Sequence, residues 1–83
     1  MSKKEKLKKR LQAKPRDFTF DEVETLLLSL DFEKSNKGKT SGSSVEFILD
    51  DISILIHKPH PRKELKPYQV KQVLNTLERN DLI

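Results

Sequence analysis

Two neighbouring segments in which apolar and polar side chains alternate, separated by Asp50-Asp51, constrain the fold most. Alternation with a period of two is typical of a strand with one buried face. A loop of two residues, or of four, pairs Phe47 with Ile54 and Val45 with Ile56, whereas an odd loop length shifts the pairing by one residue. The sequence therefore predicts an antiparallel hairpin over residues 43–57. Its apolar face is expected to hold Val45, Phe47, Leu49, Ile52, Ile54 and Ile56.

Helical patterns flank this hairpin on both sides. Residues 2–13 predict a short basic helix, in which Leu7 and Leu11 form a thin apolar stripe. Residues 19–22 match the capping box that begins a helix, and apolar residues follow at helical spacing up to Leu30. A last helix is expected from Pro67 to about Arg79, with proline in its first turn. Between the second helix and the hairpin, residues 32–37 predict a polar edge strand.

The expected order is helix, helix, three strands, helix. Two amphipathic helices on one face of a small antiparallel sheet predict a two-layer α+β domain. The order α-β-β-β-α resembles double-stranded-RNA-binding folds, here with an extra basic helix at the N-terminus. We expect residues 1–18 to form this basic helical extension and residues 19–83 to form the domain.

Charge and composition indicate the class of partner. The chain has 17 Lys and Arg against 13 Asp and Glu, and the positive charges concentrate in residues 1–16 and 58–71. Two basic blocks favour a polyanion such as RNA, although solvated surface lysine is the alternative. The absence of cysteine excludes disulfides and thiolate sites. Two histidines without a grouping of carboxylates predict no metal, and no cofactor is expected. No apolar run approaches the roughly 18 residues of a membrane span, so we expect a cytoplasmic protein.

Short motifs over residues 20–83 resemble the HicA toxins of bacterial toxin–antitoxin systems. They are a helix that ends in Leu30-Asp31-Phe32, then Ser41-Gly42-Ser43 at the start of the hairpin, and the run from Lys58 to Leu65 before the last helix. The resemblance implies a ribonuclease that cleaves mRNA without a metal and is held inactive by a HicB-like antitoxin. It also implies a double-stranded-RNA-binding-like fold.

The family's catalytic histidine lies in a Gly-Ser-His motif on the second strand, and the matching residues here are Gly42-Ser43-Ser44. Ser44 therefore stands at the histidine position, and serine is no general base near neutral pH. In the predicted register Ser44 lies opposite His57, with both side chains on the open face of the sheet. We therefore hypothesise that His57 supplies the imidazole. Ser44, His57 and His60 are the candidate catalytic residues, although each histidine can equally be a surface residue.

Candidate RNA-binding residues surround these positions. The cations in and after the loop that contains Pro59 and Pro61, called the proline loop below, and in the turn at residues 38–42 are expected to bind phosphate. Glycine in that turn would let backbone amides approach the phosphate. These residues are Lys39, Gly42, Lys58, Arg62 and Lys63.

Ile48 and Leu55 fall on the same open face as Ser44 and would give an antitoxin an apolar surface to cover. Two alternatives remain. One is an RNA-binding module without catalysis, which the serine at position 44 favours. The other is a protein-interaction domain whose lysines only keep it soluble.

Overall fold

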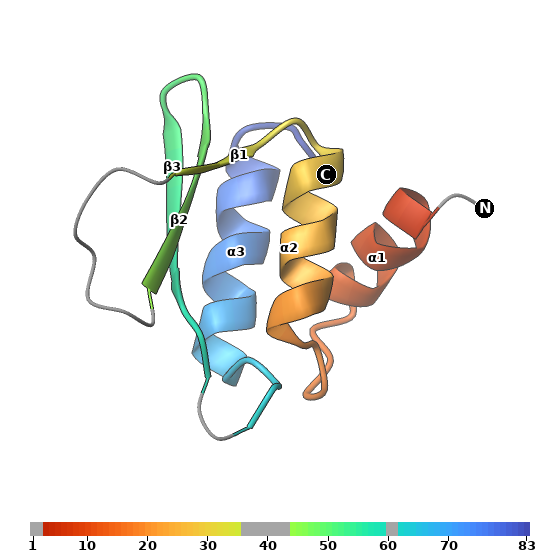
Figure 1. Cartoon of the computed structure of the whole chain (residues 1–83). Coiled ribbons are helices and arrows are strands. Elements are labelled where there is room, and N and C mark those ends of the chain that lie inside the picture. Colours follow the sequence, from red (N-terminus) through yellow and green to blue (C-terminus); the bar gives the residue numbers. More distant parts are fainter. Residues whose placement is uncertain (1–2, 36–43, 60–61) are drawn as a thin grey trace.

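The fold is a three-stranded antiparallel sheet with helices on one face (Figure 1). The computed structural model describes residues 3–35, 44–59 and 62–83. The sheet order is β1-β2-β3, and both strand pairs are antiparallel. This confirms the predicted α+β class and the order of a double-stranded-RNA-binding-like domain with an extra N-terminal helix. The elements are α1 (Lys3–Gln12), α2 (Phe20–Ser29), β1 (Glu33–Ser35), β2 (Ser44–Leu49), β3 (Ile52–His57) and α3 (Pro67–Arg79).

The hairpin of β2 and β3 has the predicted register. Leu49 pairs with Ile52, so the loop is the two-residue Asp50-Asp51 turn, and Phe47 pairs with Ile54. Asp50 has φ 52°, a left-handed conformation that Asp tolerates better than most residues. Phe47, like Ile54 and Ile56, is buried, and the other three apolar side chains of this face pack against the core. The alternation therefore fixed which face of the hairpin the helices cover.

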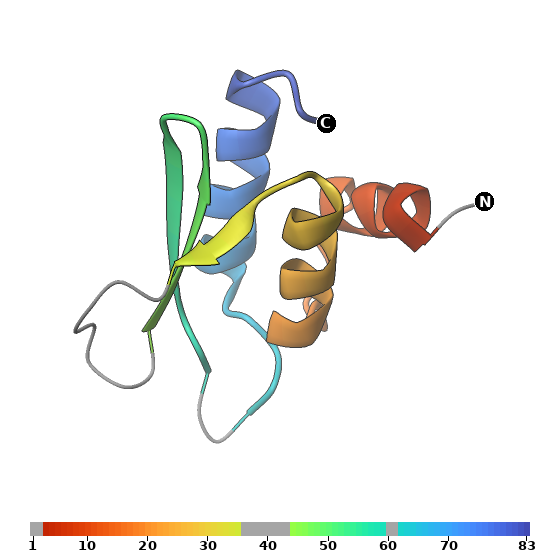
Figure 2. The same cartoon turned by 45° about the horizontal axis from the view of Figure 1, so that its top comes forward.

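The core lies between the sheet and the helices, and α1 contributes to it. In Figures 1 and 2, α2 and α3 stand beside the sheet, and α1 lies on the far side of the helical layer. Leu7 and Leu11 of α1 are buried in the same cluster as the rest of the core. The division at residue 18 stays a prediction, but α1 shares the core of the domain. The other members are Phe18, Phe20, Val23, Leu26, Leu27, Leu30, Phe32, Phe47, Ile54, Ile56, Leu65, Val70, Val73, Leu74 and Leu77.

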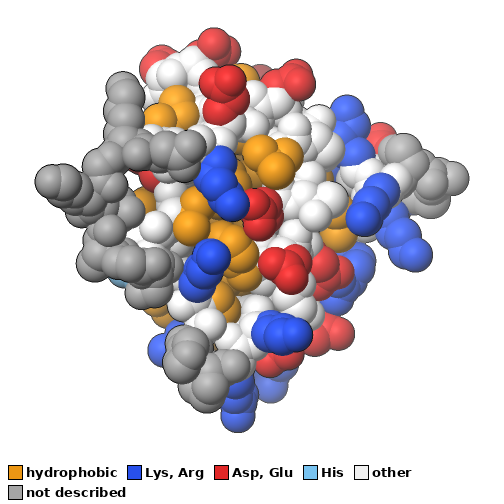
Figure 3. All heavy atoms as spheres, in the orientation of Figure 1, with side chains coloured by type: hydrophobic (Ala, Val, Ile, Leu, Met, Phe, Trp, Pro, Cys, Tyr) orange, Lys and Arg blue, Asp and Glu red, His pale blue; other side chains and the backbone are white. Residues whose placement is uncertain are grey.

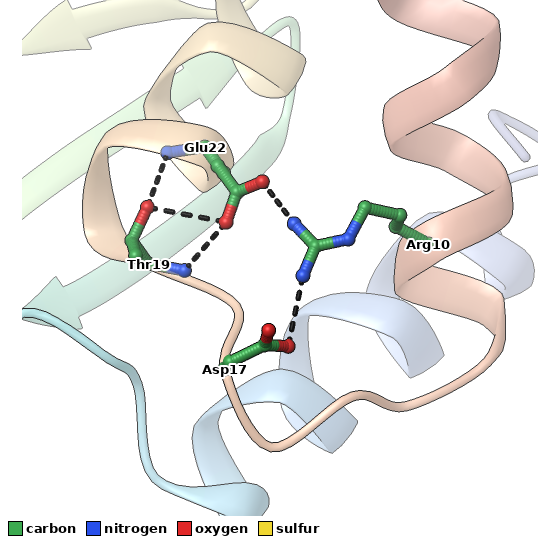
Figure 4. A network of polar contacts seen from close by, with 4 residues as sticks. All are labelled: Arg10, Asp17, Thr19 and Glu22. Atoms are coloured by element: carbon green, nitrogen blue, oxygen red, sulfur yellow. Dashed lines mark hydrogen bonds and ion pairs between the residues drawn. The ribbon is translucent and has the colours of Figure 1, made fainter.

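A polar network joins α1 to the start of α2 (Figure 4). Glu22 N–H donates to Thr19 Oγ1 over 3.2 Å and Thr19 N–H donates to Glu22 Oε1 over 3.0 Å, which completes the predicted capping box. The Arg10 guanidinium then donates to Glu22 Oε2 and, over 2.8 Å, to Asp17 Oδ1. Burial alone would raise the pKa of the Glu22 carboxyl, but the hydrogen bonds from Thr19 and Arg10 outweigh it and lower that pKa. The network orients α1 across α2.

The other elements follow the predicted boundaries closely. β1 begins at Glu33, one residue later than predicted, and residues 36 and 37 lie outside the described part. Lys34 of β1 forms an ion pair with Glu24 of α2, with 2.6 Å between Nζ and Oε2. α3 has the predicted bounds, and the terminal Leu82 and Ile83 pack against the core. Among the described residues, no helix has the length and apolar character needed to cross a membrane.

Candidate functional site

Ser44 and His57 face one another across the hairpin. They are directly paired in the β2–β3 register, and Ser44 Oγ lies 2.9 Å from His57 Nδ1. Such a contact suits a pair whose backbones do not exchange hydrogen bonds, because opposing side chains then come closest. His57 is exposed, and the contact at Nδ1 leaves Nε2 as the ring atom available to a ligand. This juxtaposition matches the predicted one, while the catalytic role stays a prediction.

Gln69, on the first turn of α3, fixes the backbone of His57. Its Nε2 donates to the His57 carbonyl oxygen over 3.0 Å, and its Oε1 accepts from Lys66 N–H over 2.9 Å. The side chain is buried, with 7% of its surface exposed. The end of β3 is thereby tied to the start of α3, so the position of His57 depends on a residue that the sequence pattern did not single out.

The proline loop between β3 and α3 is also held at its far end. Leu65 N–H donates to Phe18 O over 2.8 Å, and Phe20 N–H donates to Lys63 O over 3.1 Å. These bonds make a short bridge between the segment before α2 and the segment before α3. Lys58 and Arg62, which lie between these two fixed ends, line the same hollow as His57.

A hollow of about 690 Å³ lies where β3, this loop and the start of α3 meet. Four cations and His57 line it, against a single carboxylate, so the hollow is basic. Lys58 Nζ lies 5.4 Å from the centre of the Phe20 ring, a cation–π distance that holds the ammonium at the rim. Tyr68 contributes an exposed aromatic ring. The lining residues are Arg16, His57, Lys58, Pro59, Arg62, Glu64, Leu65, Lys66, Pro67, Tyr68 and Gln69.

The predicted site residues separate into three groups. His57, Lys58 and Arg62 line the hollow, and Ser44 contacts His57. Lys63 is exposed but is not among the lining residues. Lys39, Gly42 and His60, the other predicted site residues, lie outside the described residues.

Sequence reasoning missed Arg16, Lys66 and Gln69 as members of this site. Arg16 comes from the N-terminal extension and is distant in sequence from the other lining residues, so only the folded structure brings it to the hollow. Lys66 could have been found as the residue before the first turn of α3, since Pro67 marks that turn. The described residues contain no group of three His, Asp or Glu side chains arranged to hold a metal ion.

The open face of the sheet carries polar and apolar groups beside the Ser44–His57 pair. Glu46 accepts a hydrogen bond from the Ser53 hydroxyl across the hairpin. Leu55 of β3 is 55% exposed and Ile48 of β2 is partly exposed, as the expected apolar surface for a partner requires.

Figure 3 shows Lys and Arg side chains around α1 and at the lower end of the molecule, with Asp and Glu between them.

Comparison with known proteins identifies a family. Residues 20–78 match the family model described as the HicA toxin of bacterial toxin–antitoxin systems. The matched range runs from the first residue of α2 almost to the end of α3, so it includes Ser44, His57 and Gln69. No curated protein and no solved structure matches the chain.

Proposed function

The chain belongs to the HicA toxin family, and from that premise we propose that it is a cytoplasmic endoribonuclease that cleaves mRNA without a metal and is inhibited by a cognate antitoxin. The observation that carries the proposal is the Ser44–His57 contact at the rim of the basic hollow. An imidazole beside a cluster of cations is what phosphodiester cleavage without a metal needs, because the reaction requires a base and compensation of negative charge.

In the proposed reaction, His57 is the base. The reaction uses the tautomer in which Nδ1–H donates to Ser44 Oγ, 2.9 Å away, because this tautomer leaves the lone pair on Nε2. Nε2 takes the proton of a ribose 2′-hydroxyl, and O2′ attacks the adjacent phosphorus. The P–O5′ bond breaks and O5′ takes a proton from water; the hydroxide that remains takes the proton from Nε2, so His57 returns to its neutral form. The products are a 2′,3′-cyclic phosphate and a 5′-hydroxyl end. Serine at the family's histidine position thus orients the base on the neighbouring strand instead of acting as one.

The cations of the hollow bind and neutralise the phosphate. Arg62 and Lys58 come from the proline loop, and Arg16 and Lys66 lie on either side of it. A guanidinium can bind two phosphate oxygens at once, so we assign the charge that develops at phosphorus to Arg62. Tyr68, which is 58% exposed, is available to stack on a base.

A second candidate function is RNA binding without cleavage. One observation favours it: Ser44 occupies the position at which the family has its catalytic histidine. The basic hollow would then serve the same RNA, and the Ser44–His57 contact would only order the rim. Binding should be sensitive to salt in both cases, because both neutralise phosphates.

Cleavage of a labelled mRNA by the wild-type protein in excess EDTA tests the proposal, with binding of the same RNA measured in parallel. Cleavage that yields cyclic phosphate ends is the expected result. Salt-sensitive binding without cleavage would replace the nuclease with the binding module. If the RNA is not bound at physiological salt, both RNA functions fail and the protein-interaction alternative remains.

A further inference from the structure

The outer edge of β3 lacks the features that normally protect a strand edge. β3 ends the sheet, is six residues long, and has the sequence Ile-Ser-Ile-Leu-Ile-His, without proline or a lysine. The opposite edge is β1, whose described part is three residues long and carries Glu33 and Lys34. Natural proteins usually shorten, charge or interrupt an exposed edge, because it can pair with another strand. The difference between the two edges points to β3 as a pairing surface.

The hairpin register shows which backbone groups face this edge. Leu49 and Ile52 flank a two-residue turn, so they form a hydrogen-bonded pair, and such pairs alternate with non-bonded ones along the ladder. Ser53, Leu55 and His57 therefore direct their N–H and C=O groups away from β2. The bond from Gln69 Nε2 to the His57 carbonyl agrees with this orientation. Ser53 and Leu55 consequently present two donors and two acceptors at strand spacing.

A groove of about 470 Å³ follows the same edge, between β3 and α3. Its wall on α3 is polar, with Gln72, Asn75, Thr76 and Arg79 among its residues. His57, Tyr68 and Gln69 line both this groove and the basic hollow, so the two join at the end of β3. An extended chain lying along β3 would therefore lead into the hollow.

We propose that the β3 edge binds an extended peptide segment of a partner protein as a fourth strand, with an acidic side chain of that segment entering the basic hollow. The edge supplies the hydrogen bonds of strand addition, and the four cations supply the charge complementarity. A second copy of the chain fits less well. Antiparallel pairing of two β3 edges would bring both helical layers to one side, and the facing surfaces of α3 are polar, with Gln72 and Asn75 exposed.

The added strand of the partner would also regulate the proposed nuclease, an inference that rests on the proposed function. An acidic side chain in the hollow occupies the place of the substrate phosphate, and the strand itself lies beside His57. The partner therefore inhibits by occupying the phosphate site without changing the fold. Leu55, exposed beside the edge, gives the added strand an apolar neighbour across the open face.

The test begins by selecting binders to the whole protein from a phage-displayed library of random decapeptides. Amide hydrogen exchange is then measured with the best synthetic peptide. The expected peptides contain Asp or Glu, and they slow exchange at Ser53 and Leu55 while leaving Ile54 and Ile56, already in the ladder, unchanged. The variant Leu55→Pro removes one outward N–H and should weaken binding about tenfold, the effect of one hydrogen bond. The matched Leu55→Ala keeps that N–H and should retain most of the affinity.

Several outcomes would overturn the docking proposal: no enriched peptide, peptides that bind without this alternating protection, or protection of the same amides by self-association alone. If Leu55→Pro fails to fold, the pattern of hydrogen-exchange protection in the wild-type protein still tests the docking proposal. RNA cleavage without added peptide is measured separately. A peptide that docks while the protein neither binds nor cleaves RNA would refute the nuclease and leave the docking site standing. A docked peptide that leaves cleavage unchanged would refute the regulation.

Discussion

Gln69 ties the end of β3 to the start of α3, and its replacement by leucine should measurably weaken the fold. Gln69→Leu keeps the side chain's approximate volume but removes the bonds of 2.9 and 3.0 Å to Lys66 N–H and His57 O. A hydrogen bond contributes about 1 kcal/mol net, so the free energy of unfolding should fall by about 2 kcal/mol. Lys66 and His57 are exposed residues, so water can compensate their backbone groups in part, and a much larger loss is not expected.

Urea denaturation followed by circular dichroism measures this loss, and Gln72→Leu is the matched control. Gln72 lies one turn further along α3 and is exposed, so its replacement should change the free energy of unfolding by less than about 0.5 kcal/mol. Equal effects of the two variants would refute the assigned role of Gln69. In the RNA assay, Gln69→Leu should also slow cleavage while RNA affinity changes little, because it releases His57 and leaves the cations in place.

Three other perturbations test the packing, the electrostatics and the RNA site. Leu11→Ala should lower the free energy of unfolding in urea by about 2–5 kcal/mol, because Leu11 is fully buried; an unchanged midpoint would show that α1 is not part of the cooperative unit. The folded state lowers the pKa of the Glu22 carboxyl. The ionised carboxylate therefore adds to the free energy of unfolding above the unfolded pKa of about 4.3, and this contribution is lost as pH falls. Stability measured between about pH 5 and 3 should therefore decline less steeply in Glu22→Gln than in the wild type. Arg62→Ala should weaken RNA binding and reduce the salt slope of the binding constant by about 1, whereas an unchanged slope would remove Arg62 from the phosphate site.

The hairpin could be predicted from the sequence because its signals agree. A period of two fixes the buried face, and the acidic pair between the strands allows few loop lengths. Because Phe47 pairs with Ile54, counting three residues outward along each antiparallel strand pairs Ser44 with His57, and the structure has that pairing. The starts of α2 and α3 could also be predicted, because a capping box marks the start of α2 and a proline in the first turn marks the start of α3.

The composition of the hollow was harder to predict, because it depends on contacts between distant segments. Arg16 reaches the hollow only because the segment after it pairs with Lys63 to Leu65. Gln69 lies on an amphipathic helix, where a polar residue ordinarily indicates a solvent-facing position, yet it is buried against the end of β3. Lys63 was expected among the phosphate-binding residues on charge alone; it is not among the residues that line the hollow, and its role in RNA binding stays a prediction.

The most direct test of the central claim is the rate at which His57→Ala cleaves a labelled mRNA in EDTA, compared with the wild type. Ser53→Ala, an exposed residue of the same strand, is the control. The account predicts that His57→Ala retains its fold and most of its RNA affinity but loses cleavage, and that Ser53→Ala cleaves like the wild type. Undiminished cleavage by His57→Ala would contradict it, because the base would then have to be another residue.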